Sequence, residues 1–287
     1  NVEGLRTMIV VKDELARHGI STSFAFETGP NRLPADQAPA VTLASFDGNA
    51  RGTTPNLDRF AAEGTVFSKA HAHNVITLPS HTNILTGLYP YEHGVRENAG
   101  FRLSSKIDTI AARLKERGFS TGAFVGAFPL DSRYGLTRGF DVYEEMYKQT
   151  EEPEDFQIQQ ARADEVVARA LTWYRAQAGH PRFLWVHVYD PHAPYDPPDT
   201  WKARFPDDLY LGEVAFTDSA LAPLLDEVKA ARPAPFLAVT GDHGEARGCR
   251  CHAVRPEAPQ PSSGTNSTSA APFVIVSRAT LGSSLNR

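Results

Sequence analysis

The order of short apolar runs and helical segments constrains the fold of this chain more than any other feature. Apolar runs of strand length lie at residues 40–46, 66–70, 120–127, 183–189 and 236–240. Segments with apolar residues at helical spacing lie between them, at 55–63, 107–118, 161–178 and 211–228. Strands that alternate with helices predict the α/β class, with a mostly parallel (mixed) central sheet and helices on both faces.

Several polar residues stand directly after these predicted strands. They are Asp47, Asp190, His192, Asp242 and His243. In open α/β sheets, ligands bind outside the carboxyl ends of the strands. We therefore expect these side chains to gather at one edge of the sheet.

The segment TLPSHTNILTG, residues 77–87, is expected at the same edge. Pro79 is a favourable first helical residue and Gly87 a favourable stop, so Thr77 is expected just ahead of a helix. Unpaired backbone N–H groups and the helix dipole favour an anion there, and a hydroxyl is placed to meet a sulfate or phosphate group. The alternative is a threonine that only caps the helix.

Two further loops combine carboxylates and imidazoles. Asp242 and His243 follow a buried-type strand and are typical of half a divalent cation site, although a solvated turn has the same pattern. Asp190 and His192 stand in a proline-rich loop that is stiff enough to hold an imidazole at a fixed distance from a substrate. We expect His187, within the preceding strand, to be a hydrogen-bonded core residue.

Composition excludes some partners. The net charge of −5 gives no basic surface for nucleic acid, and no run of about 18 apolar residues predicts a membrane span. Cys249 and Cys251 are too close in sequence for an unstrained mutual disulfide. Localisation and oligomeric state stay open. Residues 1–39 show no continuous pattern and are interpreted as a lead-in to one domain spanning 40–287.

Four motifs occur in a specific order: TTPNLDRFAAEG, TLPSHTNILTGLYPYEHGV, FLWVHVYDPHAPYDPP and VTGDHGE. Together, over about residues 40–245, they resemble the catalytic N-terminal domain of the sulfatase family, within the alkaline phosphatase superfamily. The resemblance implies in-line displacement on a small-molecule sulfate or phosphate ester, with a divalent cation such as calcium, manganese or zinc. It implies Thr77 as nucleophile, Asp242 and His243 as metal ligands, and His192 at the ester or its leaving oxygen.

The chain departs from the family at the nucleophile. Formylglycine-dependent sulfatases carry cysteine or serine where Thr77 stands, and threonine cannot be converted in that way. A threonine is similar to the superfamily's phosphodiesterases and head-group transferases, which use it directly. His81 replaces an arginine that would bind the anion bidentately, and we expect His81 and Asp190 to bind the substrate.

A second departure concerns the metal ligands. The family's first strand runs into an aspartate pair, whereas here Asp47 stands alone before the sequence GNARG. If the pair lies instead in ADQAPAV, Asp36 supplies one carboxylate and Val41 none. We predict Asp47 as the third ligand and weak metal binding. Two other functions stay open: a phosphoryl head-group transferase, and a catalytically silent or truncated homologue with an incomplete metal site.

The last part of the chain is also unusual. Residues 246–271 are rich in Arg, Pro, Ser and Thr without a core pattern, and we predict a disordered loop there. An apolar run at 272–277 predicts a further strand. The smaller C-terminal subdomain typical of the family is expected to be missing from this sequence.

Overall fold

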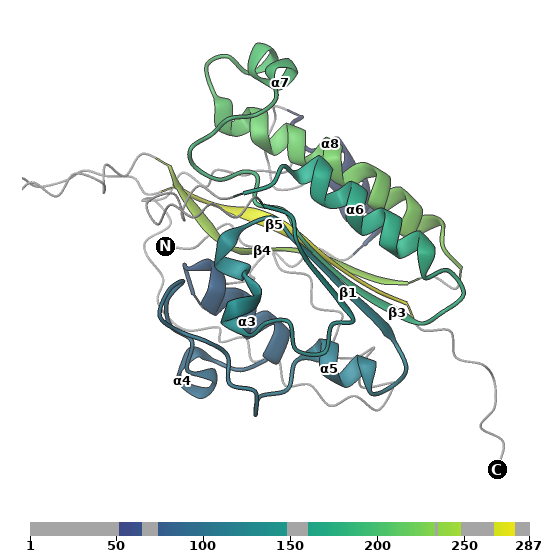
Figure 1. Cartoon of the computed structure of the whole chain (residues 1–287). Coiled ribbons are helices and arrows are strands. Elements are labelled where there is room, and N and C mark those ends of the chain that lie inside the picture. Colours follow the sequence, from purple (N-terminus) through teal and green to yellow (C-terminus); the bar gives the residue numbers. More distant parts are fainter. Residues whose placement is uncertain (1–51, 65–73, 148–159, 233–234, 248–266, 279–287) are drawn as a thin grey trace, which may run out of the picture.

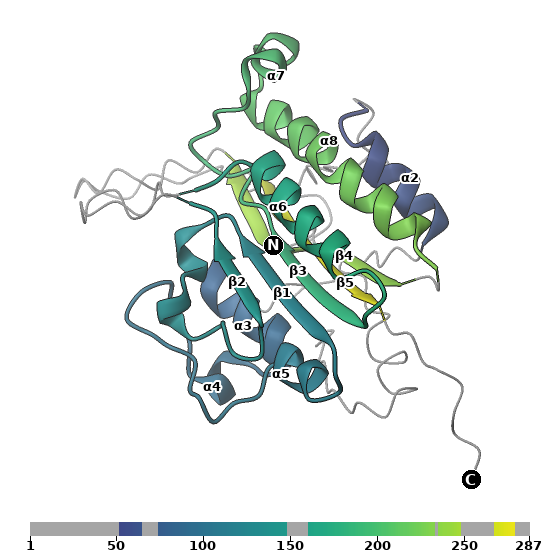
Figure 2. The ribbon, with the colours of Figure 1, turned by 45° about the vertical axis from the view of Figure 1, so that its right-hand side comes forward.

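The computed structural model describes residues 52–64, 74–147, 160–232, 235–247 and 267–278. In this part of the chain a five-stranded mixed sheet lies between two layers of helices, which confirms the predicted α/β class (Figures 1 and 2). The strands are β1 (Ser120–Val125), β2 (Val142–Glu145), β3 (Arg182–His187), β4 (Phe236–Arg247) and β5 (Ser267–Arg278). The helices are α2 (Pro55–Glu63), α3 (Thr77–Thr86), α4 (Pro90–His93), α5 (Ile110–Lys115), α6 (Ala163–Ala176), α7 (Asp199–Arg204) and α8 (Leu209–Ala230), with short 3₁₀ helices η2 (Phe128–Leu130) and η3 (Ser132–Tyr134).

The sheet has the strand order β2-β1-β3-β5-β4. Strands β2, β1 and β3 are parallel, and β5 is antiparallel to both β3 and β4. Strand β4 therefore runs in the same direction as β3. The pairing of β4 with β5 is irregular between Gly241 and Gly244, so Asp242 and His243 lie in a bulge. Bulges re-aim side chains, and they are common next to active sites.

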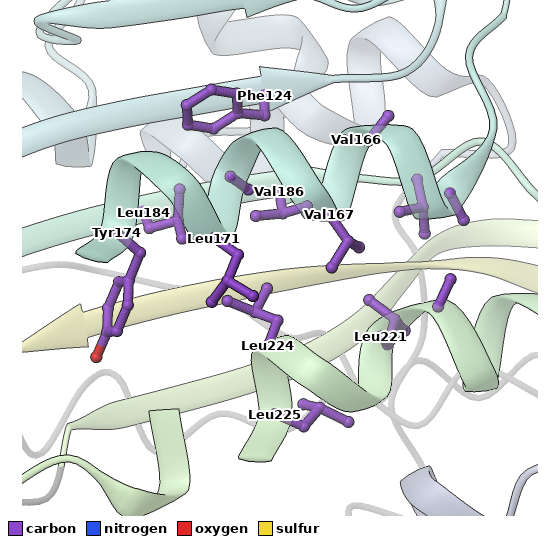
Figure 3. Packing of buried hydrophobic residues seen from close by; sticks show 14 of the residues in the cluster. Phe124, Val166, Val167, Leu171, Tyr174, Leu184, Val186, Leu221, Leu224 and Leu225 are labelled. Carbon is purple, nitrogen blue, oxygen red and sulfur yellow. The ribbon is translucent and has the colours of Figure 1, made fainter. Parts of the chain in front are cut away.

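Side chains alternate between the two faces of β3, which is buried along its whole length. Phe183 and Trp185 pack in one apolar cluster with residues of α3 and α5. Leu184 and Val186 pack in a second cluster with α6 and α8, on the opposite face (Figure 3). This two-sided burial explains why the strand reads as a continuous apolar run.

Two helices are capped by buried carboxylates from distant parts of the chain. Asp218 of α8 accepts hydrogen bonds from the backbone N–H groups of Asn56 and Leu57 at the start of α2. Asp190 accepts one from the backbone N–H of Ala163 at the start of α6. Neither helix has a local side-chain cap, so these long-range bonds satisfy N–H groups that would otherwise lack a partner.

Most predicted elements are present, with shifted ends. Helix α3 begins at Thr77 itself, so Thr77 lies in the first turn and not ahead of it, and Gly87 ends the helix in the left-handed conformation. Strand β2 was not predicted from the sequence. Strands β4 and β5 extend into both ends of the predicted loop at 246–271.

The predicted strands at 40–46 and 66–70 lie outside the described residues, as do the lead-in and Asp47. No helix in the described part of the chain is long and apolar enough to span a membrane.

Candidate active site

Thr77, the predicted nucleophile, lies at the N-terminus of α3. Thr77 is 5% exposed, and the next backbone N–H, of Leu78, donates to Asn98 Oδ1 at 2.8 Å. The Ser80 hydroxyl donates to the backbone carbonyl of Asp242. The first turn of α3 is therefore tied directly to the bulge of β4.

Polar atoms of Thr77, Asp242 and His243 converge at this junction. His243 Nε2 lies 3.2 Å from Thr77 Oγ1 and 3.4 Å from Asp242 Oδ2. Both contacts use the same ring nitrogen, Nε2. They therefore do not form a catalytic triad, in which one ring nitrogen faces the nucleophile and the other binds the carboxylate. Two ligands at about 2.1 Å from one cation at a tetrahedral angle are about 3.4 Å apart, so the spacing fits a shared metal ion.

The Asp242 carboxylate also fits a cation. It is 2% exposed, and its Oδ1 accepts no hydrogen bond from the residues that the structure describes. Burial alone would raise the pKa of this carboxyl, but the neighbouring His243 and His81 rings outweigh burial and hold the pKa well below its usual range. The carboxylate thus stays ionised with one oxygen available to a metal.

A complete metal site is not formed by the described residues. Among them, no group of three or more His, Cys, Asp or Glu side chains could hold a metal ion. Asp242 and His243 supply two ligands from β4, and Asp47, the predicted third, lies outside the described ranges.

His81 and His187 lie in a buried layer of rings next to Asp242. His81 is fully buried, with Nε2 3.5 Å from Asp242 Oδ2 and its ring 5.3 Å from the Trp185 ring. The His187 ring meets the His81 ring edge-on at 4.8 Å. His187 is a core residue as expected, but its Nδ1 makes no hydrogen bond within the described part of the chain. Burial, together with His81, lowers the pKa of His187 well below its ordinary value.

The predicted role of His81 is substrate binding. In the structure, the full burial of His81 places it beside a predicted metal ligand. This position supports orientation of Asp242, and direct contact with a substrate stays a prediction.

His192 continues the same series of rings. Its ring stacks on that of Tyr189 at 4.2 Å, and the Tyr189 ring lies 6.5 Å from that of His187. The His192 Nδ1 lies 2.7 Å from the carbonyl oxygen of Ala193. A carbonyl only accepts, so Nδ1 carries the proton and Nε2 is the nitrogen that remains for a substrate. His192 is close enough to His187 to contribute to its lowered pKa.

Asp190 has a different position from the one expected for a substrate contact. Asp190 lies after the end of β3, on the side of the sheet that α6 covers. There its Oδ2 accepts a hydrogen bond from the backbone N–H of Ala163 at 2.8 Å. Burial raises the pKa of Asp190 to about 6. The geometry gives Asp190 a capping role, and its contact with a substrate stays a prediction.

Three polar residues at or near the site were not singled out from the sequence: Ser80, Asn98 and Glu213. Ser80 and Asn98 act through backbone groups of distant residues, which no local pattern reveals. Glu213 did leave a signal, because it is a single carboxylate within the apolar stretch LGEVAF of α8.

Comparison with known proteins places this fold. A solved structure of a protein in the alkaline phosphatase superfamily from Vibrio parahaemolyticus matches with a TM-score of 0.56 and 21% identity, over 80% of this chain and 56% of that chain. The mixed sheet with helices on both faces is thus the α/β fold of this superfamily, as expected from the sequence motifs.

A family within this superfamily can also be assigned. The Sulfatase family model matches residues 35–280, and the chain belongs to the sulfatase family. It is 34% identical over 82 residues to an N-acetylgalactosamine-6-O-sulfatase of Bacteroides thetaiotaomicron. The matched region is 26% of this chain and 16% of that protein. It is 24% identical over 212 residues to an arylsulfatase of Klebsiella aerogenes. This second match covers 60% of this chain and 44% of that protein. The chain therefore spans less than half of these curated relatives.

Proposed function

We propose that this chain carries the catalytic part of a metal-dependent hydrolase of sulfate or phosphate esters, with Thr77 as the nucleophile. The observation that carries the proposal is the convergence of Thr77 Oγ1, His243 Nε2 and Asp242 Oδ2, with 3.2 and 3.4 Å between neighbouring atoms. Membership of the sulfatase family supports sulfate esters, and the unmodified hydroxyl of threonine supports phosphate esters as well.

Asp242 and His243 are the residues that would hold a divalent cation of the type generally used in this superfamily. Such a cation supplies charge neutralisation at the ester oxygens and lowers the pKa of a nearby hydroxyl. The identity of the metal among calcium, manganese and zinc stays open. The buried Oδ1 of Asp242, which has no hydrogen-bond partner among the described residues, supports its part in this site.

The reaction proposed for the chain's own residues has two displacements. Thr77 releases its hydroxyl proton to solvent water, and Oγ1 forms a bond to the sulfur or phosphorus as the bond to the leaving oxygen breaks. The step uses His192 with a proton on each ring nitrogen: the Nε2 proton passes to the leaving oxygen, and Nδ1 keeps the proton that it donates to Ala193. Water then attacks the ester on Thr77 and gives a proton to His192 Nε2, Thr77 regains its hydroxyl proton from solvent, and sulfate or phosphate is released. The N-terminal end of α3 favours the negative charge that develops next to Thr77.

The test is a parallel assay of the purified chain with calcium, manganese and zinc. Aryl sulfate, aryl phosphate, aryl phosphodiester and an N-acetylhexosamine 6-sulfate form the substrate panel, the last because of the named specificity of one relative. Turnover that requires metal and is lost in Thr77→Ala supports the proposal. Thr86→Ala is the matched control, because Thr86 lies at the other end of α3, where its hydroxyl donates to the Thr82 carbonyl and accepts from the Leu88 backbone N–H.

A catalytically silent homologue is the second candidate. It is favoured by the lack of a three-ligand metal group among the described residues. No metal uptake, together with equal behaviour of the wild type and Thr77→Ala, would support this alternative. A head-group transferase would instead release the leaving alcohol with the phosphoryl group transferred to an added acceptor alcohol.

A further inference from the structure

Glu213 is a buried carboxylate that the reaction above does not use. It lies in α8 between apolar neighbours and is 2% exposed. Burial raises the pKa of its carboxyl to about 8. A buried carboxylate is costly unless it makes specific hydrogen bonds, so its partners indicate what it does.

Both oxygens of Glu213 bind the loop that carries His192. Oε2 accepts from the backbone N–H of His192 at 3.1 Å, and Oε1 accepts from the backbone N–H of Asp196 at 2.6 Å. The loop contains four prolines, at positions 191, 194, 197 and 198, which have no N–H to donate. One carboxylate therefore takes two of the few backbone donors of this segment.

The loop also packs closely on the first turns of α8. A Cβ added to Gly212 would lie only 3.0 Å from Pro197 Cγ, so the helix backbone and the proline are in direct contact. The rings of Tyr195 and Tyr210 meet at 5.2 Å. The bonds to Glu213 are thus formed across a tight interface, where a small displacement of the loop would break them.

The orientation of the His192 ring depends on the same backbone. Its Nδ1 donates to the carbonyl of Ala193, which lies within the stretch held by Glu213. This bond keeps a proton on Nδ1, so Nε2 is the nitrogen that delivers its proton to the substrate and is left bare afterwards. If the loop backbone rotates, the carbonyl moves and the ring loses both its orientation and its tautomer.

We propose that Glu213 is a positioning residue for His192: by binding the backbone at both ends of residues 192–196, it fixes the ring so that Nε2 faces the leaving oxygen. The inference rests on the proposed function, in which His192 protonates that oxygen. Glu213→Gln tests it with little change in volume. A glutamine amide has one accepting oxygen, and its NH₂ group would meet a backbone N–H as donor against donor.

The kinetic experiment compares wild type, Glu213→Gln, His192→Ala and the double variant on two aryl esters of different leaving ability. A misplaced acid is expected to lower kcat about ten- to hundredfold. The loss should be larger for phenyl than for 4-nitrophenyl esters, because the poorer leaving group needs the proton more. KM should change less than about threefold, and Glu213→Gln should cause no further loss when His192 is already alanine.

Asp218→Asn is the matched control. Asp218 is a second buried carboxylate of α8 that accepts backbone N–H groups, but those groups belong to α2. We expect this variant to lower stability without any dependence of kcat on the leaving group. If Glu213→Gln slows both esters equally, or adds its full effect to His192→Ala, the inference is overturned.

A second readout does not need turnover. The ¹⁵N shifts of the His192 imidazole, assigned with His192→Ala, should show the Nδ1–H tautomer in the wild type and a mixture of tautomers in Glu213→Gln. Unchanged shifts would overturn the inference. Full activity in both Thr77→Ala and His192→Ala would instead refute the proposed function, so the two failures are distinguishable.

Discussion

Replacing Asp218 by alanine should separate α2 from its capping carboxylate. Asp218 accepts from the backbone N–H groups of Asn56 and Leu57 at 3.1 and 2.8 Å, and from the Asn56 side chain at 2.8 Å. Loss of an N-cap costs about 0.5–2 kcal/mol, and a buried donor left without a partner costs about 1–3 kcal/mol. Burial raises the pKa of Asp218, so the cost of desolvating the carboxylate offsets part of the stability that its hydrogen bonds contribute. We expect a net loss of about 3 kcal/mol in the free energy of unfolding.

The assay is urea unfolding followed by circular dichroism, with Asp226→Ala as the control. Asp226 lies on the same helix and pairs with Arg59 of α2 at 2.8 Å, but both side chains are at least half exposed. Such a surface pair contributes less than about 1 kcal/mol. Equal effects of the two substitutions, or a loss below about 1 kcal/mol for Asp218→Ala, would refute the assignment of Asp218 as the cap of α2.

Three further predictions concern the backbone, a buried histidine and the metal. Gly139→Ala should abolish folding or cost at least about 3 kcal/mol in thermal melts, because a Cβ would lie 2.0 Å from the Ala112 backbone nitrogen. Gly179 is also at positive φ but has open space around it, so Gly179→Ala should cost only about 1 kcal/mol in the same assay. Burial lowers the pKa of His93 to about 4, against the smaller opposite effect of Glu92. The unfolded state therefore binds more protons than the folded state between pH 4 and 6.5, and the free energy of unfolding should fall by about 2 kcal/mol from pH 7 to pH 5. His93→Gln should reduce this pH dependence, as measured by urea titrations. Asp242→Asn should weaken metal binding at least tenfold by calorimetry, whereas Asp226→Asn should leave it unchanged.

The fold could be predicted because strand β3 and its neighbours have a simple local signature. A strand buried on both faces is mainly apolar, as residues 183–186 of β3 are, and the helices next to it show an apolar stripe. The α/β order could therefore be predicted from the sequence. A helix that starts at Pro79 and stops at Gly87 was predicted, and the structure has it two residues longer at its start, from Thr77. Helix ends depend on capping contacts such as the bond from Leu78 to Asn98, which the local sequence does not contain.

The site could be predicted only in part. Thr77, Asp242 and His243 come together as expected, because the bulge of β4 and the start of α3 meet at one edge of the sheet. The sequence did not distinguish Asp190, whose carboxylate caps α6, from His192 two residues later, whose ring stacks on that of Tyr189. Glu213 was missed because its partners are backbone groups of a loop that is distant in the sequence.

The most direct test of the account is to identify the residue that forms the covalent ester. The metal-loaded chain is mixed with aryl sulfate or aryl phosphate, quenched during turnover, and mapped by peptide mass spectrometry. We predict a sulfuryl or phosphoryl group on the hydroxyl of Thr77, and neither adduct nor turnover in Thr77→Ala. Turnover that persists in Thr77→Ala, or an adduct on another residue, would contradict the assignment of Thr77 as the nucleophile.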